Sequence, residues 1–283
     1  MGGIGGRGQG LPKAVLALRA LHPFPSTLNA LLVTALAVLA GAAATIAVGL
    51  GMSMLLLQFC IGAVNDLADE PADSLTRPDK PIVAGHIGRR RVATLAVASG
   101  GGGLLLAGWI NSAVLMLAGA VLAIGLAYDL LLKRTGWGWL AFAAAFPLLP
   151  LFAWVGAAGV LPPRAELLLP AAALAGVALQ LANGIVDVER DRAVGQPGLA
   201  ARVGHRSAVL LMAGLLVCVY GVAWTTLSQA SGAALFGALV ASAAAIAGGG
   251  LLAATGTGLR EWGWRLEAVA LALLAVAWLV AAG

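Results

Sequence analysis

Two groups of carboxylate and amide side chains recur in this chain with the same spacing. Both follow the pattern Asn-x3-Asp-x3-Asp, and they comprise Asn65, Asp69 and Asp73 and then Asn183, Asp187 and Asp191. On an α-helix, positions four apart lie on one face about 6 Å apart along the axis. Each group therefore predicts a row of oxygen ligands along one side of a helix.

Rows of this kind suit a hard divalent cation. Carboxylate and amide oxygens are typical ligands of Mg²⁺, which keeps part of its water shell and bridges protein carboxylates to substrate phosphates. Cys60 and Cys218 both fall in apolar stretches and are interpreted as packing residues rather than metal ligands. The other interpretation of the acidic residues, solvated helix ends, does not explain why the spacing recurs.

Basic residues near these rows can supply the other half of a diphosphate site. Arg77 and Lys80 follow the first row, while Tyr128, Lys133 and Arg134 lie at the end of a later apolar stretch. A diphosphate leaving group carries about three negative charges, and cations placed where that charge develops stabilise it. Lys133 and Arg134 can also be explained as anchors at a membrane surface, and that alternative stays open.

The elements that must position these residues are membrane-spanning helices. Of the 283 residues, 61% are hydrophobic and 10% charged, against roughly 25% charged in a soluble domain. A bilayer-spanning helix needs about 20 mainly apolar residues. The nine essentially uncharged runs of that length are 24–43, 45–65, 92–109, 112–132, 138–159, 167–187, 207–227, 231–254 and 266–282. The sequence predicts an all-α, polytopic membrane protein.

The basic residues predict the orientation of these spans. Apart from Arg164, the Lys and Arg residues fall before the first span or in alternate loops, so the positive-inside rule puts the N-terminus in the cytoplasm. The net charge of +5 is thus explained without a nucleic-acid partner. We expect one multi-pass domain over 1–283 in the cell (inner) membrane, with a tail at 1–20 and cytoplasmic loops at 66–91 and 188–206 that carry the acidic residues.

The local geometry of the first row is less regular than its spacing. Pro71 disturbs a continuing helix, so we expect Asp73 on a kinked or unwound segment. Asp66 points roughly 100° away from the row and is expected either behind the ligands or facing water.

An internal duplication is a further prediction. Beyond the acidic rows, Gly85-His86 is echoed by Gly204-His205, and Trp137-Gly138-Trp139 by Trp262-Gly263-Trp264. Four predicted spans separate the equivalent positions, and an even number keeps both copies on the same side of the membrane. The pattern indicates a four-helix unit repeated in parallel, followed by one more helix.

These residues together resemble the UbiA superfamily of intramembrane aromatic and lipid prenyltransferases. The family pattern Asn-Asp-x2-Asp-x3-Asp is matched by Asn65, Asp66, Asp69 and Asp73, and the Arg-Pro-x-Lys-Pro-Ile stretch that starts at Arg77 looks like the segment that follows it. A second Asp-x3-Asp motif falls on Asp187 and Asp191, and a Tyr-x4-Lys element falls on Tyr128 and Lys133. The resemblance covers nearly the whole chain.

The resemblance implies nine helices around a central cavity in which Mg²⁺ holds a prenyl diphosphate. The metal ligands that it implies are Asn65, Asp69, Asp187 and Asp191, with Asp66, Asp73 and Asn183 behind them. The residues that would grip the diphosphate are Arg77, Lys80, Tyr128, Lys133 and Arg134, and those expected to be catalytic are Asn65, Asp69, Asp187, Asp191, Tyr128 and Lys133. A carbocation formed there would be kept from water in the apolar, lipid-embedded chamber until it met a hydrophobic acceptor.

Two departures from the family pattern affect the choice of acceptor. Tyr128 is followed by Asp129 and Leu130, where many members have a proline soon after the tyrosine, and the run 195–199 lacks the usual Thr-Leu. The acceptor, aromatic or lipid, stays open.

Four other functions are alternatives to this interpretation. A terpene cyclase of the same family would act on the prenyl diphosphate alone. A secondary transporter would place ionisable groups near the middle of the membrane, whereas these cluster at one face. A CDP-alcohol phosphotransferase lacks support because its Asp-Gly-x2-Ala-Arg run is absent, and a non-catalytic scaffold gives no reason for the repeated carboxylates.

Overall fold

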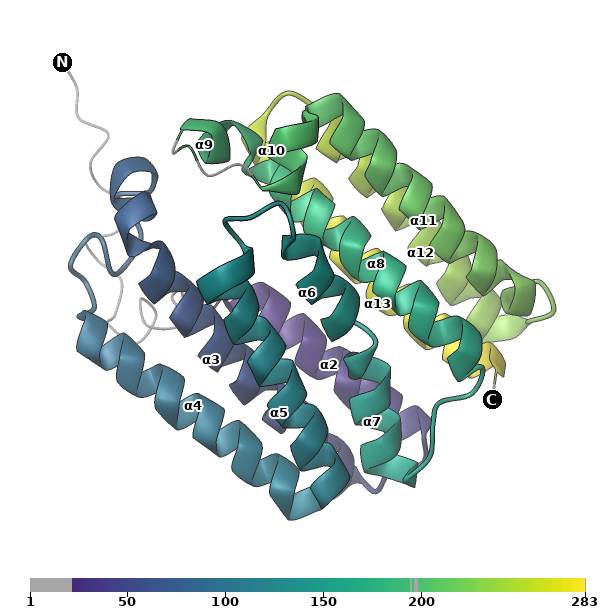
Figure 1. Cartoon of the computed structure of the whole chain (residues 1–283). Helices are drawn as coiled ribbons and strands as arrows, with labels where there is room; N and C mark the ends of the chain where they lie inside the picture. Colours follow the sequence, from purple (N-terminus) through teal and green to yellow (C-terminus); the bar gives the residue numbers. More distant parts are fainter. Residues whose placement is uncertain (1–21, 194, 196–197, 283) are drawn as a thin grey trace.

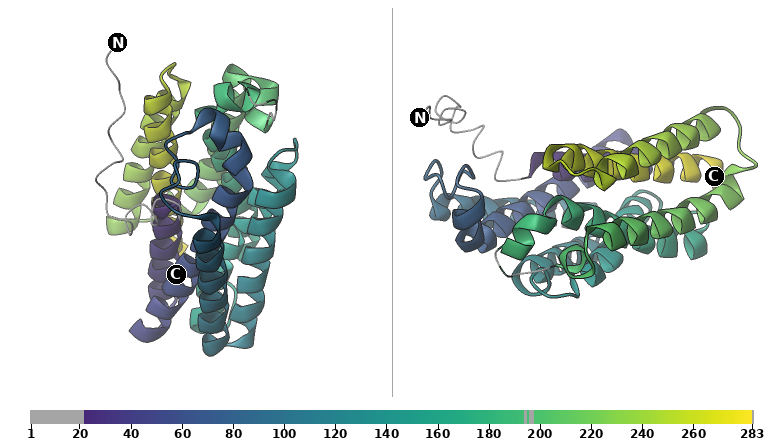
Figure 2. Two further views of the ribbon diagram at one scale, coloured as in Figure 1. Left: turned by 90° about the vertical axis from the view of Figure 1, so that its left-hand side faces the viewer. Right: turned by 90° about the horizontal axis from the view of Figure 1, so that it is seen from above.

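Long helices lie side by side along roughly one direction, and two short helices cover one end of the bundle (Figures 1 and 2). The computed structural model describes residues 22–193, 195 and 198–282. The predicted tail at 1–20 lies outside these residues.

The described chain is all-helical, as the composition predicts. Its elements are α2 (Pro23–Leu39), α3 (Ala44–Thr76), α4 (Arg89–Ile110), α5 (Ser112–Ala127), the π-helix η1 (Tyr128–Leu132), α6 (Gly138–Ala145), α7 (Leu148–Ala158), α8 (Ala165–Val186), α9 (Val188–Ala193), α10 (Leu199–Val203), α11 (His205–Leu227), α12 (Gly232–Ala253) and α13 (Thr257–Ala282).

Eight helical segments of the described chain are long and apolar enough to cross a membrane. Two of them combine neighbouring elements, α5 with η1 and α6 with α7. The first predicted span corresponds to α2, which has 17 residues and lies at the lower end of the length needed for a bilayer. The predicted count of nine spans is therefore supported for eight, and the cytoplasmic N-terminus stays a prediction.

The local expectations for the first acidic row are corrected by α3. The helix runs without a break through Pro71 to Thr76, so Asp73 lies on a regular helix rather than on an unwound segment. Pro71 is on the exposed side of α3, so its ring needs no room inside the bundle. The expected loop at 66–91 starts only after Thr76, and the one at 188–206 contains α9 and α10.

The expected repeat has a structural counterpart. Each acidic row lies near the end of a helix, α3 or α8, and each is followed by a Gly-His pair, which precedes α4 in the first half and lies at the start of α11 in the second. Gly85 has φ 70° and Gly204 has φ 89°, which is the left-handed region that favours glycine. Both acidic rows lie at the same end of the bundle (Figure 1).

Close helix packing holds the two rows in place. A Cβ added to Gly103 of α4 would come within 2.9 Å of Leu57 on α3, and one added to Gly248 of α12 would come within 3.0 Å of the Gly263 carbonyl oxygen on α13. Small residues let helix backbones approach closely in membrane proteins. Close helix packing therefore accounts for both glycines, and neither needs to be explained as part of a substrate site.

Candidate active site

A cavity of about 680 Å³ lies inside the bundle. Its lining residues come from α2, α3, α5, η1, α6, α7, α8, α9, α11 and α13 and from segments between them, with none from the described parts of α4 or α12. The polar and charged side chains that line it are His22, Ser26, Asn29, Gln58, Asn65, Asp69, Arg77, Asp79, Tyr128, Asp129, Lys133, Asn183, Asp187, Arg190 and Glu261. Most of them lie near the motif-bearing ends of α3 and α8, and the remaining wall is mainly apolar.

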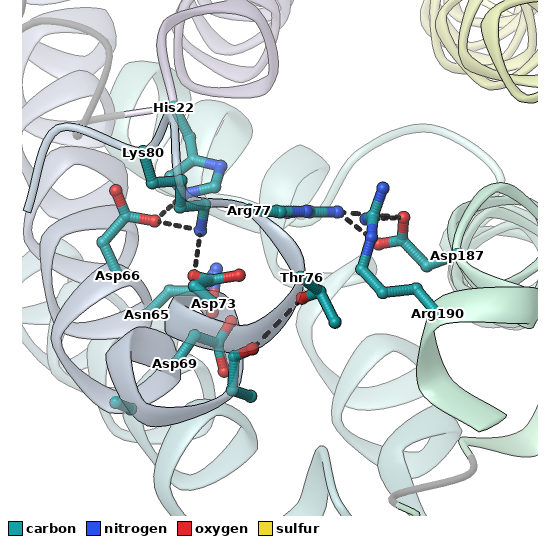
Figure 3. A network of polar contacts seen from close by, with 12 residues as sticks. His22, Asn65, Asp66, Asp69, Asp73, Thr76, Arg77, Lys80, Asp187 and Arg190 are labelled. Carbon is teal, nitrogen blue, oxygen red and sulfur yellow. Dashed lines mark hydrogen bonds and ion pairs between the residues drawn. The ribbon is translucent and has the colours of Figure 1, made fainter. Parts of the chain in front are cut away.

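Two lysines neutralise the acidic residues on α3. Lys133 reaches from the end of η1 and donates to Asn65 Oδ1 and Asp69 Oδ2. Lys80 lies 2.6 Å from Asp66 Oδ1 and 2.8 Å from Asp73 Oδ2. The four oxygen-bearing side chains thus form two pairs, each centred on one ammonium group. Figure 3 shows the pair around Lys80.

Asp66 lies behind the row and is buried, so it does not face water. Its Oδ1 also lies 3.0 Å from His22 Nε2 at the start of α2. Burial opposes the charged form of Lys80, but the carboxylates of Asp66 and Asp73 outweigh it and raise the pKa of Lys80. The lysine therefore stays protonated and holds the loop after α3 against the helix.

Arginines surround the second acidic row. α8 ends at Val186, and Asp187 leaves the helical conformation with φ −102° and ψ 6°. Arg77 Nη2 lies 2.9 Å from both carboxylate oxygens of Asp187, and Arg190 donates to Oδ1. Because Arg77 belongs to the loop after α3, this pair connects the two acidic rows directly (Figure 3).

Electrostatics at the second row favour the binding of further positive charge. Burial raises the pKa of Asp187, and Arg77 and Lys133 offset only part of that rise. Burial and the neighbouring charge of Asp187 raise the pKa of Asp191 to about 6. A cation placed between these two carboxylates would relieve their repulsion and lower both values.

A third network fixes the segment that carries the second row. The buried Arg260 of α13 donates from Nη1 to both oxygens of Glu189, at 2.8 Å each, and from Nε to the Ala254 carbonyl at 2.8 Å. His205 Nδ1 lies 3.3 Å from Arg260 Nη2. Burial opposes the charged form of Glu189, but the hydrogen bonds from Arg260 and the positive charge of Arg260 together outweigh it and lower the pKa of Glu189. Glu189 therefore anchors α9 to α13.

The structure brings most of the predicted site residues together. Those that line the cavity are Asn65, Asp69, Arg77, Tyr128, Lys133, Asn183 and Asp187. Those that do not line it are Asp66, Asp73, Lys80, Arg134 and Asp191. Arg134 donates to the Ala68 carbonyl at 2.7 Å, so in this state it holds α3 rather than pointing at a ligand.

The polar and charged cavity residues that were not predicted as part of the site are His22, Ser26, Asn29, Gln58, Asp79, Asp129, Arg190 and Glu261. Arg190 lies three positions after Asp187, a spacing at which helical side chains meet, so this signal was present. His22 gave no signal, because it lies 44 positions before its partner Asp66. Asp129 was noticed only as a departure from the family pattern, yet it is buried and lines the cavity beside Tyr128.

The amide and carboxylate oxygens of the two rows are the type of ligand that a hard divalent cation binds. Among the residues that the structure describes, no three Asp, Glu, His or Cys side chains converge closely enough to hold a metal by themselves. The amide oxygen of Asn65 and a carboxylate oxygen of Asp69 nevertheless converge on the Lys133 ammonium, which shows that one cation can contact both.

Relatives of known activity match about half of this chain. Chlorophyll synthase of Oryza sativa is 31% identical over 164 residues, which cover 54% of this chain and 44% of that protein. Digeranylgeranylglyceryl phosphate synthase of Archaeoglobus fulgidus is 32% identical over 161 residues, which cover 56% and 54%. The chain thus spans about half the length of these relatives.

Solved structures match over nearly the full length. A UbiA homologue from Aeropyrum pernix has a TM-score of 0.74 at 18% identity, covering 92% of this chain and 98% of that one. A homologue from Archaeoglobus fulgidus, bound to GPP and Mg²⁺, has a TM-score of 0.67 at 18% identity with the same coverage. The UbiA prenyltransferase family matches residues 14–250. This chain therefore belongs to the UbiA prenyltransferase family.

Proposed function

We propose that the protein is a Mg²⁺-dependent intramembrane prenyltransferase that moves an isoprenyl group from a prenyl diphosphate to an aromatic or lipid acceptor. The observation that carries the proposal is the Arg77–Asp187 pair, which joins the two acidic rows across the polar end of an apolar cavity. Such a site combines oxygen ligands, cations and an apolar chamber, which are the three parts that ionisation of a prenyl diphosphate needs.

The polar end would hold the diphosphate. Bound Mg²⁺ would neutralise the charge that develops on the leaving group. The metal ligands proposed are Asn65, Asp69, Asp187 and Asp191, with Asp66, Asp73 and Asn183 supporting them. Once a divalent ion pairs with the carboxylates, Lys133 and Arg77 are free to donate to phosphate oxygens, where Arg can bind two oxygens at once.

The wall just below the polar end would protect the allylic cation. The Tyr128 and Phe142 rings meet edge to face with centroids 5.1 Å apart, and Phe142 stacks on Phe146 at 5.9 Å. Aromatic faces attract cations, and these three residues line the cavity. Their ring faces would stabilise positive charge, and the two phenylalanines carry no heteroatom that could capture the cation, while the apolar wall excludes water.

The membrane supplies the environment for both substrates. The isoprenoid tail and a hydrophobic acceptor would reach the cavity from the lipid, and the diphosphate end would stay at the polar face. We place this face towards the cytoplasm of the cell (inner) membrane, because the basic loops lie on that side of the predicted spans.

The proposal is tested by replacing one carboxylate in each row. Asp69→Ala and Asp187→Ala should each lower Mg²⁺-dependent diphosphate release from farnesyl or geranylgeranyl diphosphate by at least about 100-fold, the scale expected when charge stabilisation of the leaving group is lost. Glu166→Ala is the matched control, because Glu166 lies exposed in the first turn of α8, and it should retain full turnover. Full turnover by both cavity variants would refute the assignment.

Product analysis separates the proposed reaction from its alternatives. The purified protein is incubated with prenyl diphosphates of several lengths and a panel of aromatic and lipid acceptors, and products are identified by mass spectrometry. A prenylated acceptor supports the transferase. A cyclised hydrocarbon formed without any acceptor would instead assign a terpene cyclase.

A further inference from the structure

The π-helix η1 places a carboxyl group on the cavity wall beside Tyr128. The backbone N–H of Lys133 donates to the Tyr128 carbonyl at 2.9 Å, so this turn spans one residue more than an α-helical turn. On an α-helix, positions five apart would point about 140° away from each other, whereas the wider turn brings Tyr128 and Lys133 towards the same side. Tyr128, Asp129 and Lys133 all line the cavity, while Leu130 and Leu131 are exposed.

Asp129 has a buried carboxylate oxygen without a hydrogen-bond partner. The residue is 4% exposed, and its Oδ2 meets no partner among the described residues. Asp69 and Asp187 line the same cavity, but each forms an ion pair, with Lys133 and Arg77 respectively. Buried polar atoms are usually hydrogen-bonded. The orphaned oxygen therefore indicates a donor that the described chain does not supply.

Two further carboxyl groups line the cavity outside the acidic rows, and neither is in this position. Asp79 and Glu261 are both exposed, and Glu261 forms an ion pair with Arg265. Water can solvate an exposed carboxylate, so these two need no ligand. Among the cavity-lining residues that the structure describes, only Asp129 combines burial with an unpartnered carboxylate oxygen.

Both neighbours of Asp129 along η1 belong to the proposed donor site. Tyr128 meets Phe142 with ring centroids 5.1 Å apart, in the wall that would stabilise the allylic cation. Lys133 donates to Asn65 and Asp69, at the end that would hold the diphosphate. A nucleophile bound at Asp129 would therefore lie close to the carbon that is attacked.

Prenyl transfer to a hydroxyl group needs a proton acceptor. The bond between the allylic carbon and the diphosphate oxygen breaks, and its electron pair leaves with the diphosphate. A lone pair of the hydroxyl oxygen forms the new C–O bond, and the hydroxyl proton must go to a base. A carboxylate within hydrogen-bond reach of that proton can take it, and general bases typically contribute about 10²–10⁴-fold to the rate.

We propose that Asp129 accepts the proton of the acceptor, and that the acceptor is a hydrophobic alcohol or phenol whose hydroxyl oxygen becomes prenylated to give an ether. This inference rests on the proposed function, because it assigns the acceptor side of the same cavity. A hydroxyl group supplies the donor that Asp129 lacks, whereas an aromatic C–H does not. The last torsion of an Asp side chain is broad, so either carboxylate oxygen can turn towards the hydroxyl.

The first test asks which atom of the acceptor reacts. Full-length protein in lipid nanodiscs is incubated with Mg²⁺, geranylgeranyl diphosphate and a panel of long-chain alcohols and alkylphenols, each paired with its own methyl ether. We expect prenyl ethers from the hydroxyl compounds and no product from the methyl ethers, as measured by mass spectrometry. Prenylation of ring carbons, or equal yields from the methyl ethers, would overturn the inference.

The second test replaces the base and uses the hydroxyl compound that gives most product. Asp129→Asn should lower ether formation by at least about 100-fold. It should lower diphosphate release in the absence of acceptor much less, because ionisation of the donor does not need the acceptor proton to be removed. Glu166→Gln, at an exposed position in the first turn of α8, is the control and should change neither rate.

Rescue separates proton transfer from a structural role. Asp129→Glu keeps a carboxyl group and should form more ether than Asp129→Asn. Added formate should raise ether formation by Asp129→Ala, whose truncated side chain leaves room for a small carboxylate, and should not raise it in Asp129→Asn. Equal losses of ether formation and diphosphate release without any rescue would assign Asp129 to the fold and overturn its role as a base, as would full ether formation by Asp129→Asn.

The outcomes also separate this inference from the proposed function. Diphosphate release by the wild-type protein without prenylation of any hydroxyl compound would overturn the role of Asp129 and leave the diphosphate site intact. Absence of Mg²⁺-dependent diphosphate release would overturn both.

Discussion

The two acidic rows share a spacing but differ in backbone and in counterions. The row on α3 lies on an unbroken helix and is neutralised by Lys80 and Lys133. The row at the end of α8 lies where the helix breaks at Asp187, and that residue is neutralised by Arg77 and Arg190. The same residue pattern therefore lies on one continuous helix in the first half of the molecule and spans a helix end in the second half.

The difference suggests a division of tasks. An ammonium is a compact charge on a flexible stem, whereas a guanidinium is a planar fork that binds two oxygens in fixed geometry. The lysine-paired row can exchange its cation for another with little rearrangement. The arginine-paired row fixes the orientation of Asp187 and connects it to the opposite loop.

The largest expected effect comes from removing Lys133 beside the first row, and removal of Arg190 beside the second row is its comparison. Lys133 alone contacts both Asn65 and Asp69, so Lys133→Ala should lower turnover by about 100-fold, the usual cost of one charge-stabilising donor. Arg190→Ala should cost about 10-fold or less, because Arg77 still holds Asp187. Steady-state kinetics with farnesyl or geranylgeranyl diphosphate measures both, and equal losses would remove the distinction between the rows.

An intermediate effect is expected from removing Arg260, which anchors α9 to α13. Arg260→Ala removes the hydrogen bonds to Glu189 and to the Ala254 carbonyl, and losing buried hydrogen bonds of this kind costs about 1–3 kcal/mol. The contribution of the Glu189 pair is smaller than for two buried ions, because the Glu189 side chain is 60% exposed. Thermal unfolding in detergent measures the loss. Arg90→Ala, on the exposed surface of α4, is the control that should change little.

The smallest effect on turnover is expected at Pro71. Proline inside a helix costs about 3 kcal/mol relative to alanine, and α3 is already regular around it. Pro71→Ala should therefore raise stability by less than about 3 kcal/mol and leave turnover within about twofold. A tenfold loss of turnover would mean that the first row depends on Pro71. The backbone difference between the first row and the second row, which is interrupted at Asp187, would then no longer hold.

Hydropathy located the membrane-crossing parts of the helices but not their full length. The run expected at 45–65 is the apolar part of α3. The helix continues for about three more turns, which carry the acidic residues, and ends at Thr76. The run expected at 266–282 likewise begins at Thr257 in the structure, before Arg260 and Arg265. Hydropathy reports which residues avoid water, whereas helix ends depend on backbone hydrogen bonds, which charged residues also form.

The candidate site was predictable in its ligand types but not in its pairings. Spacing alone placed Asn65 and Asp69 on one face, and the structure has both lining the cavity. The pairing of Arg77 with Asp187 joins residues 110 positions apart, and no local pattern specifies such a contact. The break between α6 and α7 and the π-helix at Tyr128 were also missed, because both lie inside runs of uniform hydropathy.

The contact between Arg77 and Asp187 couples evolutionary change in one half of the chain to the other half. If the repeated motifs record a duplication, a change of charge at Asp187 in one half would leave Arg77 in the other half without its counterpart. A split gene that expressed each half separately would retain both rows of oxygen ligands but would have to reassemble this link between subunits. In a single chain, the covalent connection between the halves keeps this link at high effective concentration.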